Sequence, residues 1–123
     1  MKTYRAVPRN KARMLKWKND RPWFKAWERT KGNARVRGIA FRLSLPVFKG
    51  LVMKGCHYCG DSASLGLDRV NNRRGYVDSN VVPCCRWCNS AKLERSLSEF
   101  RAWALQLARR FEMEPVFKEK EKQ

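Results

Sequence analysis

Two Cys-x-x-Cys pairs constrain this chain more than any other feature of its sequence. The first pair is Cys56 and Cys59, the second is Cys85 and Cys88, and 25 residues separate them. A short Cys-x-x-Cys turn holds two sulfur atoms on one side of a metal, so two such turns supply the four ligands of a tetrahedral structural zinc site. The sequence therefore predicts that Zn²⁺ joins the two ends of this segment.

The cysteine count supports a metal over disulfides. Five cysteines leave one unpaired in any all-disulfide scheme, whereas two pairs and one spare fit metal binding in a reducing, intracellular compartment. We interpret Cys84, which precedes the second pair, as a small buried residue. His57 lies inside the first pair; it can replace a cysteine ligand or hydrogen-bond outward, and four available thiolates favour the second role.

The charge of the chain indicates a polyanionic partner. The 123 residues suit one domain with appendages, and 28 Lys and Arg against 11 Asp and Glu give a net charge of +17. Residues 1–54 hold 16 basic and 2 acidic side chains. Nucleic acid is favoured over a membrane, because no segment approaches the ~18 consecutive apolar residues of a bilayer span. The first 15 residues also lack the apolar run of a secretory signal.

Residues 1–22 are predicted to be a basic arm, irregular or partly helical, that orders on a phosphate backbone. A tail that only increases solubility is the alternative. Trp17 argues against it, because an indole in such a tail usually packs on a nucleic-acid base or a protein surface when a partner binds. Pro22 then suits the first turn of a support helix, followed by a short strand at 38–43.

Two further helices flank the cysteine pairs. Ser44 is a candidate cap for a helix that ends at Lys54 and Gly55. The Ser-x-x-Glu sequence of 96–99 has the form of a capping box and opens an amphipathic packing helix over 97–112. A charged tail, 113–123, follows.

Between the cysteine pairs the pattern predicts a strand, a loop, a returning strand and a helix. The first strand carries Asp68 and Arg69, residues 71–76 form the loop, and the helix starts at the second cysteine pair and carries Asn89. Because zinc would clamp both ends, we expect Asp68 and Asn89 to meet at one point.

These residues together resemble the HNH, or ββα-metal, nuclease family, in the zinc-knuckle branch common among phage and intron-encoded endonucleases. The resemblance is specific over 56–92 and looser over 33–60. It implies an α+β fold: a small zinc-stapled ββα-metal core at 56–95, flanking helices that complete a domain at 23–112, and the basic N-terminal arm.

The resemblance also implies the roles of four residues. Asp68 and Asn89 would bind one divalent metal, and their hard oxygen ligands suit Mg²⁺ or Mn²⁺. Asn80 matches the family asparagine that braces the loop. Arg69 stands where the family usually has a general-base histidine, and an arginine cannot accept a proton at ordinary pH.

Three accounts of this departure stay open. Arg69 can stabilise the charge of the transition state while the metal acidifies the attacking water. Tyr58, Tyr76 or His57 can assist proton transfer or attack directly. The third account is an inactive nuclease whose fold is kept as a basic binding module.

The sequence thus predicts a metal-dependent endonuclease, of phage or mobile-element type, that cuts or nicks DNA as a monomer or homodimer. Five basic residues are expected to hold backbone phosphates: Arg73, Arg74, Arg86, Lys92 and Arg95. For Lys92 a solvated helix position is an equal alternative. The competing function, motivated by the net charge and Arg69, is a structural protein that binds nucleic acid, RNA included, in a large ribonucleoprotein.

Overall fold

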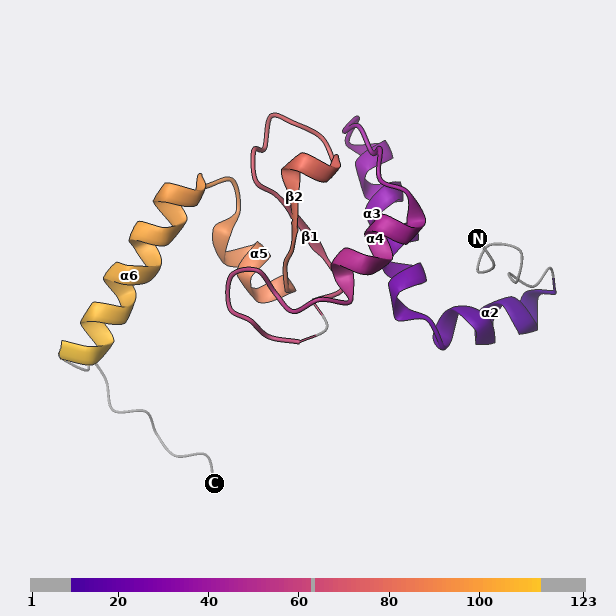
Figure 1. Ribbon diagram of the computed structural model, residues 1–123, viewed down its shortest axis with the longest axis horizontal. Helices are drawn as coiled ribbons and strands as arrows, with labels where there is room; N and C mark the ends of the chain where they lie inside the picture. The colour runs from indigo at the N-terminus through magenta and orange to yellow at the C-terminus, as the bar shows by residue number, and fades with distance from the viewer. Residues whose placement is uncertain (1–9, 63, 114–123) are drawn as a thin grey trace, which may run out of the picture. The chain divides into compact units, whose positions relative to one another are not determined.

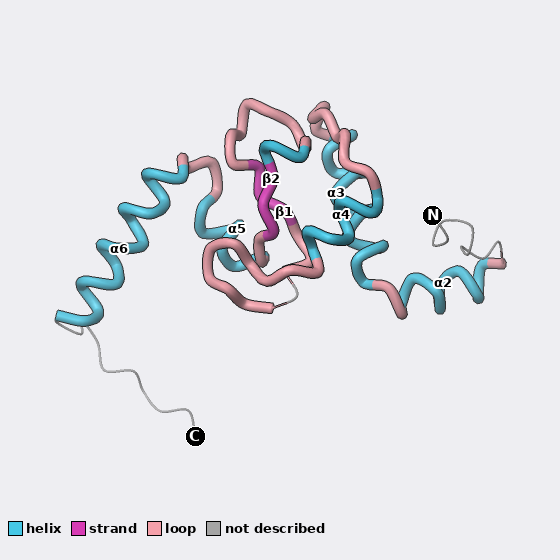
Figure 2. Tube along the Cα trace, in the orientation of Figure 1, coloured by secondary structure: helices cyan, strands magenta, loops and turns pink. Residues whose placement is uncertain are grey.

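The computed structural model describes residues 10–62 and 64–113, and the α+β fold class is confirmed. The chain divides into two compact units, Met1–Ala91 and Lys92–Gln123. Figure 1 shows the order of the elements, and Figure 2 shows how short the strands are beside the helices and loops. The helices and strands are α2 (Lys11–Asn19), α3 (Pro22–Val36), α4 (Leu45–Val52), β1 (Leu67–Arg69), the 3₁₀ helix η1 (Asp78–Asn80), β2 (Val81–Pro83), α5 (Arg86–Lys92) and α6 (Leu97–Met113).

Helix α2 lies within the predicted basic arm, whose residues 1–9 are outside the described residues. The Asn10 side chain caps this helix by accepting hydrogen bonds from the backbone N–H groups of Ala12 and Arg13. Trp17 is buried, and its ring meets Phe24 edge to face at a centroid distance of 4.9 Å. The indole of the arm therefore packs on protein.

Helices α3 and α4 form the main hydrophobic core of the first unit. Pro22 occupies the first turn of α3, and the Ser44 hydroxyl accepts a hydrogen bond from the Val47 N–H at 3.4 Å, as the sequence predicts. Helix α4 ends at Val52, slightly before the predicted end at Lys54. The core consists of Trp17, Trp23, Phe24, Ala26, Leu43, Leu45, Phe48, Val52, Leu67 and Val81.

Strands β1 and β2 pair in antiparallel register, with Asp68 opposite Val82. The strand predicted at 38–43 is wrong in extent, because the structure has only an isolated parallel bridge between Phe41 and Tyr76 there. The Tyr76 N–H donates to the Ala40 carbonyl, and the Arg42 N–H donates to the Tyr76 carbonyl. Tyr76 of the 71–76 loop is thus the residue that pairs with this segment, and a single bridged pair does not form a β-ladder.

The second unit contains α6, and the predicted capping box is confirmed. The Glu99 side chain accepts from the Ser96 N–H at 2.9 Å, and the Ser96 hydroxyl accepts from the Glu99 N–H at 3.1 Å. These bonds hold the pKa of the Glu99 carboxyl below its ordinary value. Within this unit no described side chain of α6 is buried, and its packing role stays a prediction.

Two glycines give a matched test of how the 71–76 loop packs. A Cβ added at Gly75 would lie 2.6 Å from the Ala40 carbonyl oxygen, whereas a Cβ at Gly50, on α4, would meet open space. We expect Gly75→Ala to destabilise the fold by about 1–3 kcal/mol, because backbone would have to move. Gly50→Ala should stabilise it by about 0.5–1 kcal/mol, because the unfolded chain loses freedom. Urea unfolding of the zinc-loaded protein measures both, and equal effects would contradict this packing.

Candidate metal centre and nucleic-acid site

The four predicted cysteine ligands come together. The Sγ atoms of Cys56, Cys59, Cys85 and Cys88 all lie within 4.8 Å of one another. Cys56 and Cys59 precede β1, whereas Cys85 and Cys88 follow β2 at the start of α5. The cluster therefore closes the hairpin at its open end and joins it to the helix.

The spacing of these sulfur atoms fits zinc. A tetrahedron with Zn–S bonds of about 2.3 Å has edges of about 3.8 Å. The Sγ atoms of Cys59 and Cys85 are 3.8 Å apart, which is the length of such an edge. Four thiolates are also the donor set that a structural zinc prefers, so the cluster is able to hold this metal.

Backbone N–H groups lie near the sulfur atoms, and they favour the thiolate form of Cys56. The Asp61 N–H points to Cys59 Sγ at 3.5 Å, and the Cys88 N–H points to Cys85 Sγ at 3.4 Å. Burial alone would raise the pKa of Cys56, but hydrogen bonds from backbone groups, those of Cys59 and Cys85 first, outweigh it and lower this pKa to about 6. Cys56 is thus the thiol of the cluster that ionises most readily, whereas burial raises the pKa of Cys88.

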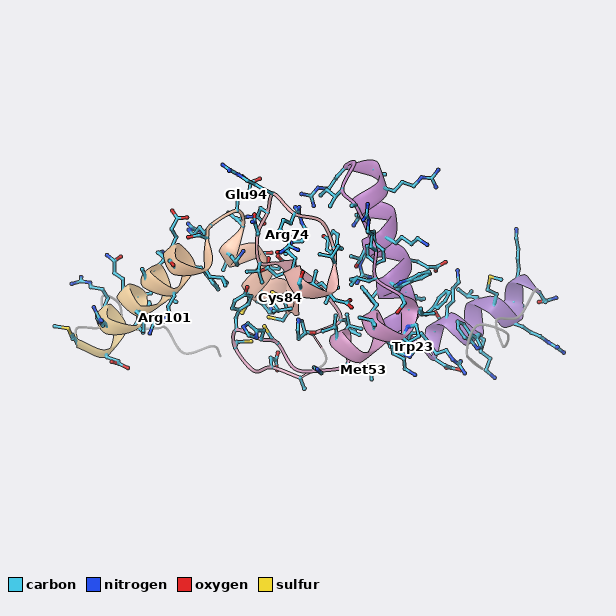
Figure 3. All side chains as sticks on the ribbon, turned by 45° about the horizontal axis from the view of Figure 1, so that its top comes forward. Trp23, Met53, Arg74, Cys84, Glu94 and Arg101 are labelled. Carbon is cyan, nitrogen blue, oxygen red and sulfur yellow. The ribbon has the colours of Figure 1, made fainter. Side chains whose placement is uncertain are left out.

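Cys84 is the spare cysteine that the sequence predicts. It is completely buried, and its thiol donates to the Cys85 carbonyl oxygen at 3.3 Å. Burial raises its pKa, with the neighbouring Cys56 and Asp68 adding to the shift. Figure 3 labels Cys84 in the middle of the first unit, among other sulfur atoms. A neutral thiol in this environment is a packing group.

Asn80 braces the loop that joins the two strands. Its Oδ1 accepts from the Asn71 N–H at 2.9 Å, and its Nδ2 donates to the carbonyl oxygens of Asn71 and Gly75 at 3.0 and 2.9 Å. The side chain is 1% exposed, so these bonds lie in a poorly solvated environment, where losing them would be costly. The geometry is that of the bracing asparagine expected from the sequence.

Arg69 points to the opposite face of the hairpin from Asp68, since side chains alternate along a strand. Its Nη1 donates to the carbonyl oxygens of Asn72 and Arg74 at 2.9 and 3.0 Å. Its guanidinium also lies over the Tyr76 ring, 5.6 Å from the centroid. Arg69 and Asn80 therefore both tie the 71–76 loop to the hairpin, through different backbone groups of the loop.

Asp68 is buried on the face of the hairpin that meets the cysteine cluster. Its carboxylate is 4% exposed, and its Oδ2 accepts a hydrogen bond from the Tyr58 hydroxyl at 2.5 Å. Burial first, and then this hydrogen bond, raise the pKa of Tyr58 above its ordinary value. Tyr58 is thus kept as a neutral hydrogen-bond donor to the carboxylate.

Asn89 lies on α5, in the turn after the second cysteine pair. Its Nδ2 donates to the Leu67 carbonyl oxygen at 3.4 Å, so the side chain reaches the residue beside Asp68 in β1. With Nδ2 turned to the strand, Oδ1 is the atom that can bind a cation. Asn89 lines an open groove, whereas Asp68 is not among the described residues that line it.

The predicted phosphate-binding residues fall into different environments. Arg73, Arg74 and Arg86 are exposed, and Arg74 also donates to the Ser79 hydroxyl at 2.8 Å. Arg95 lies with its guanidinium 5.0 Å from the centroid of the Trp103 ring. Lys92 is completely buried, so the solvated-helix alternative for this residue is wrong. Its phosphate-binding role stays a prediction.

The sequence interpretation missed three groove residues. Arg29 and Arg37, which belong to the segment of the support helix, both line the groove with Asn89. Trp87, between the cysteines of the second pair, is 72% exposed and lines it as well. An aromatic residue next to Arg86 inside a metal-binding turn is the signal that could have identified Trp87.

Comparison with known proteins supports the fold. The chain matches PacI, a rare-cutting HNH restriction endonuclease, with a TM-score of 0.58 and 23% identity, over 73% of this chain and 79% of that chain. The chain therefore has the fold of an HNH endonuclease.

Sequence comparison adds a viral relative but no assigned activity. An uncharacterised protein of Acanthamoeba polyphaga mimivirus is 33% identical over 86 residues, which are 68% of this chain and 16% of that protein. The chain thus spans about a sixth of the length of this curated relative. No protein-family model matches the chain. Among the described residues, we find no helix of the length and apolar character needed to cross a membrane.

The fifth cysteine provides a control for the zinc site. We expect Cys88→Ala to lose the bound zinc and the cooperative unfolding transition, because three thiolates leave the tetrahedron incomplete. Cys84→Ala should keep one zinc per chain, because Cys84 is outside the cluster. Elemental analysis after gel filtration and thermal unfolding measure both. Equal zinc content in the two variants would contradict this assignment.

Acid should also weaken the centre. The Cys56 pKa is lowered in the folded chain, so the contribution of its thiolate to stability is full above the ordinary thiol pKa of 9.0 and is lost as the pH falls through about 6. Protons also compete with zinc for the other thiolates. We expect the melting temperature and the zinc content to fall together across this range, and a melting temperature that does not change with pH would contradict this.

Proposed function

We propose that this protein is a metal-dependent endonuclease that hydrolyses DNA phosphodiester bonds with an HNH-type site. The observation that carries the proposal is the placement of Asp68 on β1 and Asn89 on α5, linked by the Asn89–Leu67 hydrogen bond. The fold shared with an HNH restriction endonuclease supports it. The finer assignment, to a phage or mobile-element enzyme of homing or nicking type, rests on the sequence resemblance alone.

Asp68 and Asn89 are the proposed ligands of the catalytic cation. A carboxylate and an amide oxygen are hard donors that suit Mg²⁺ or Mn²⁺, so the residues present fit such an ion. A carboxylate has two oxygens, so the bond from Tyr58 to Oδ2 is compatible with cation binding. When bound, the ion would stabilise negative charge on the leaving oxygen and acidify the attacking water.

The remaining residues of the site position these ligands. Tyr58 holds the Asp68 carboxylate, and its raised pKa keeps its proton at neutral pH, which argues against direct attack by a phenolate in this state. Asn80 and Arg69 fix the 71–76 loop, whose exposed Arg73 and Arg74 can hold backbone phosphates. Both protons of Arg69 Nη1 are used by the loop, so its part in this proposal is support.

DNA is the proposed substrate for two reasons. The net charge of +17 favours a polyanion, and the structural neighbour is described as perturbing DNA. A monomer can nick one strand, and a homodimer can cut both.

A second candidate function is favoured by the same arginine. Because Arg69 replaces a histidine base and is engaged in the loop, the fold is able to serve as a structural protein that binds nucleic acid, RNA included, without cutting it. Such a protein would co-purify with RNA and would show no metal-dependent cleavage.

A plasmid assay separates the two functions. With Mg²⁺ or Mn²⁺ present, we expect the protein to nick supercoiled DNA, and Asp68→Asn to reduce the rate by about 100-fold or more, because a cation ligand is weakened. Asp78→Asn is the matched control: this aspartate is exposed in η1 and should cut at the wild-type rate. Arg69→His adds the family base and tests whether its absence limits the rate.

No nicking by the wild-type protein, or equal rates for wild type and Asp68→Asn, would contradict the nuclease proposal. Zinc content and thermal unfolding of each variant show that a lost rate is not a lost fold.

A further inference from the structure

A groove between α3, α5 and the segment that leads into β1 is not used by the proposed catalytic residues, apart from Asn89 at its wall. Its volume is about 520 Å³, and all its lining residues belong to the first unit. The lining residues that matter here are Arg29, Arg37, Arg86, Asn33, Trp87 and Asn89.

The groove is positively charged. Three arginines line it, and the described lining residues include no aspartate or glutamate. All three are exposed, so their guanidinium groups can meet a ligand. Arg29 is anchored at the edge by a hydrogen bond from its Nη2 to the Leu65 carbonyl oxygen at 3.5 Å. A concave surface with charge of one sign attracts an anion with several charges.

Trp87 gives the groove an aromatic platform. The indole is 72% exposed, although burial of a side chain of this size is strongly favourable. Trp87 lies between Cys85 and Cys88, which both belong to the sulfur cluster. Bound zinc would therefore fix the backbone that carries the indole. The Arg86 guanidinium lies over the Trp87 ring, 5.2 Å from its centroid, so a cation is already in contact with this aromatic surface.

The size of the groove favours a nucleotide as its ligand over a duplex. Pockets of about 300–1,000 Å³ enclose a molecule of drug size, and a nucleotide is of this size, whereas a turn of duplex is far larger. Arginines beside an exposed aromatic ring are the combination that binds single strands: the charges hold phosphates and the ring stacks on a base. A base inside a duplex does not offer its face to such a ring.

From this combination we infer that the groove binds a single strand of nucleic acid, with an unpaired base stacked on Trp87 and with Arg29, Arg37 and Arg86 on its phosphates. The bound nucleic-acid strand would pass Asn89, the proposed ligand of the catalytic cation. This part of the inference rests on the proposed function. It adds a substrate class: DNA whose strands are locally separated, or single-stranded DNA, beside the site of cleavage.

Binding can be measured without cleavage. Fluorescence anisotropy would follow a labelled single strand of about 12 nucleotides and zinc-loaded protein, without Mg²⁺ or Mn²⁺. We expect Trp87→Ala to weaken binding roughly 5- to 150-fold, the range for one base–aromatic stack. Trp87→Phe should keep most of the affinity. On a strand of abasic spacer units of the same length, Trp87→Ala should bind like the wild type, because no base is present to stack.

Two matched controls come from the chain. Phe111→Ala removes an exposed aromatic side chain on α6 that does not line the groove, and it should leave binding unchanged. Arg37→Gln should lower the slope of log affinity against log salt by about 0.7, the value for one phosphate contact on a single strand. Arg35→Gln, an exposed α3 arginine that does not line the groove, should change it less. The Arg37 variant also tests the groove if Trp87→Ala fails to retain zinc.

Three results would overturn the inference: wild-type affinity of a zinc-loaded Trp87→Ala for the single strand, an equal loss on the abasic strand, or the same salt slope for Arg37→Gln and wild type. Failure of the nuclease proposal gives a different result. In that case no plasmid is nicked, while Trp87 and Arg37 still determine single-strand binding in the absence of divalent metal.

Discussion

The cluster of four cysteines is placed so that a bound metal would hold together a unit that its strands alone would not stabilise. β1 and β2 are three residues each, and an isolated two-stranded hairpin is marginal in water. In small zinc domains the metal contributes about 10–16 kcal/mol, which is comparable with the about 5–15 kcal/mol of net stability of a whole domain. The positions of Tyr58, Trp87 and Asn89 depend on this cluster, because Tyr58 lies inside its first turn, Trp87 inside its second, and Asn89 just after.

The loop opposite the cluster is fixed by contacts of a different kind. Asn80 bonds to backbone groups of Asn71 and Gly75, Arg69 bonds to two other loop carbonyls, and Gly75 allows Ala40 to approach. A charged side chain that makes two backbone hydrogen bonds and lies over an aromatic ring is a strong structural tie. Arg69 thus has a structural use that needs no proton transfer.

Much of this arrangement follows from local sequence signals. The cysteine spacing predicts the cluster, because a Cys-x-x-Cys turn fixes two sulfur atoms by itself. Ser44 and the Ser96–Glu99 capping box predict helix starts, because a cap needs only the adjacent backbone N–H groups. The strand at 38–43 was wrong in extent, because a strand needs a partner and the loop beside it offers one residue.

The sequence by itself determined the zinc ligands, the ββα order and the residues Asp68, Asn80 and Asn89 as the chemical candidates, because each depends on short spacings in one segment. Only the tertiary structure decided that Asp68 is buried against Tyr58, that Arg69 holds the loop and that Arg29, Arg37 and Trp87 share a groove with Asn89. The groove brings together residues up to 60 positions apart, from Arg29 on α3 to Asn89 on α5. Its assembly depends on how separate elements pack together, which periodicity within one element does not specify.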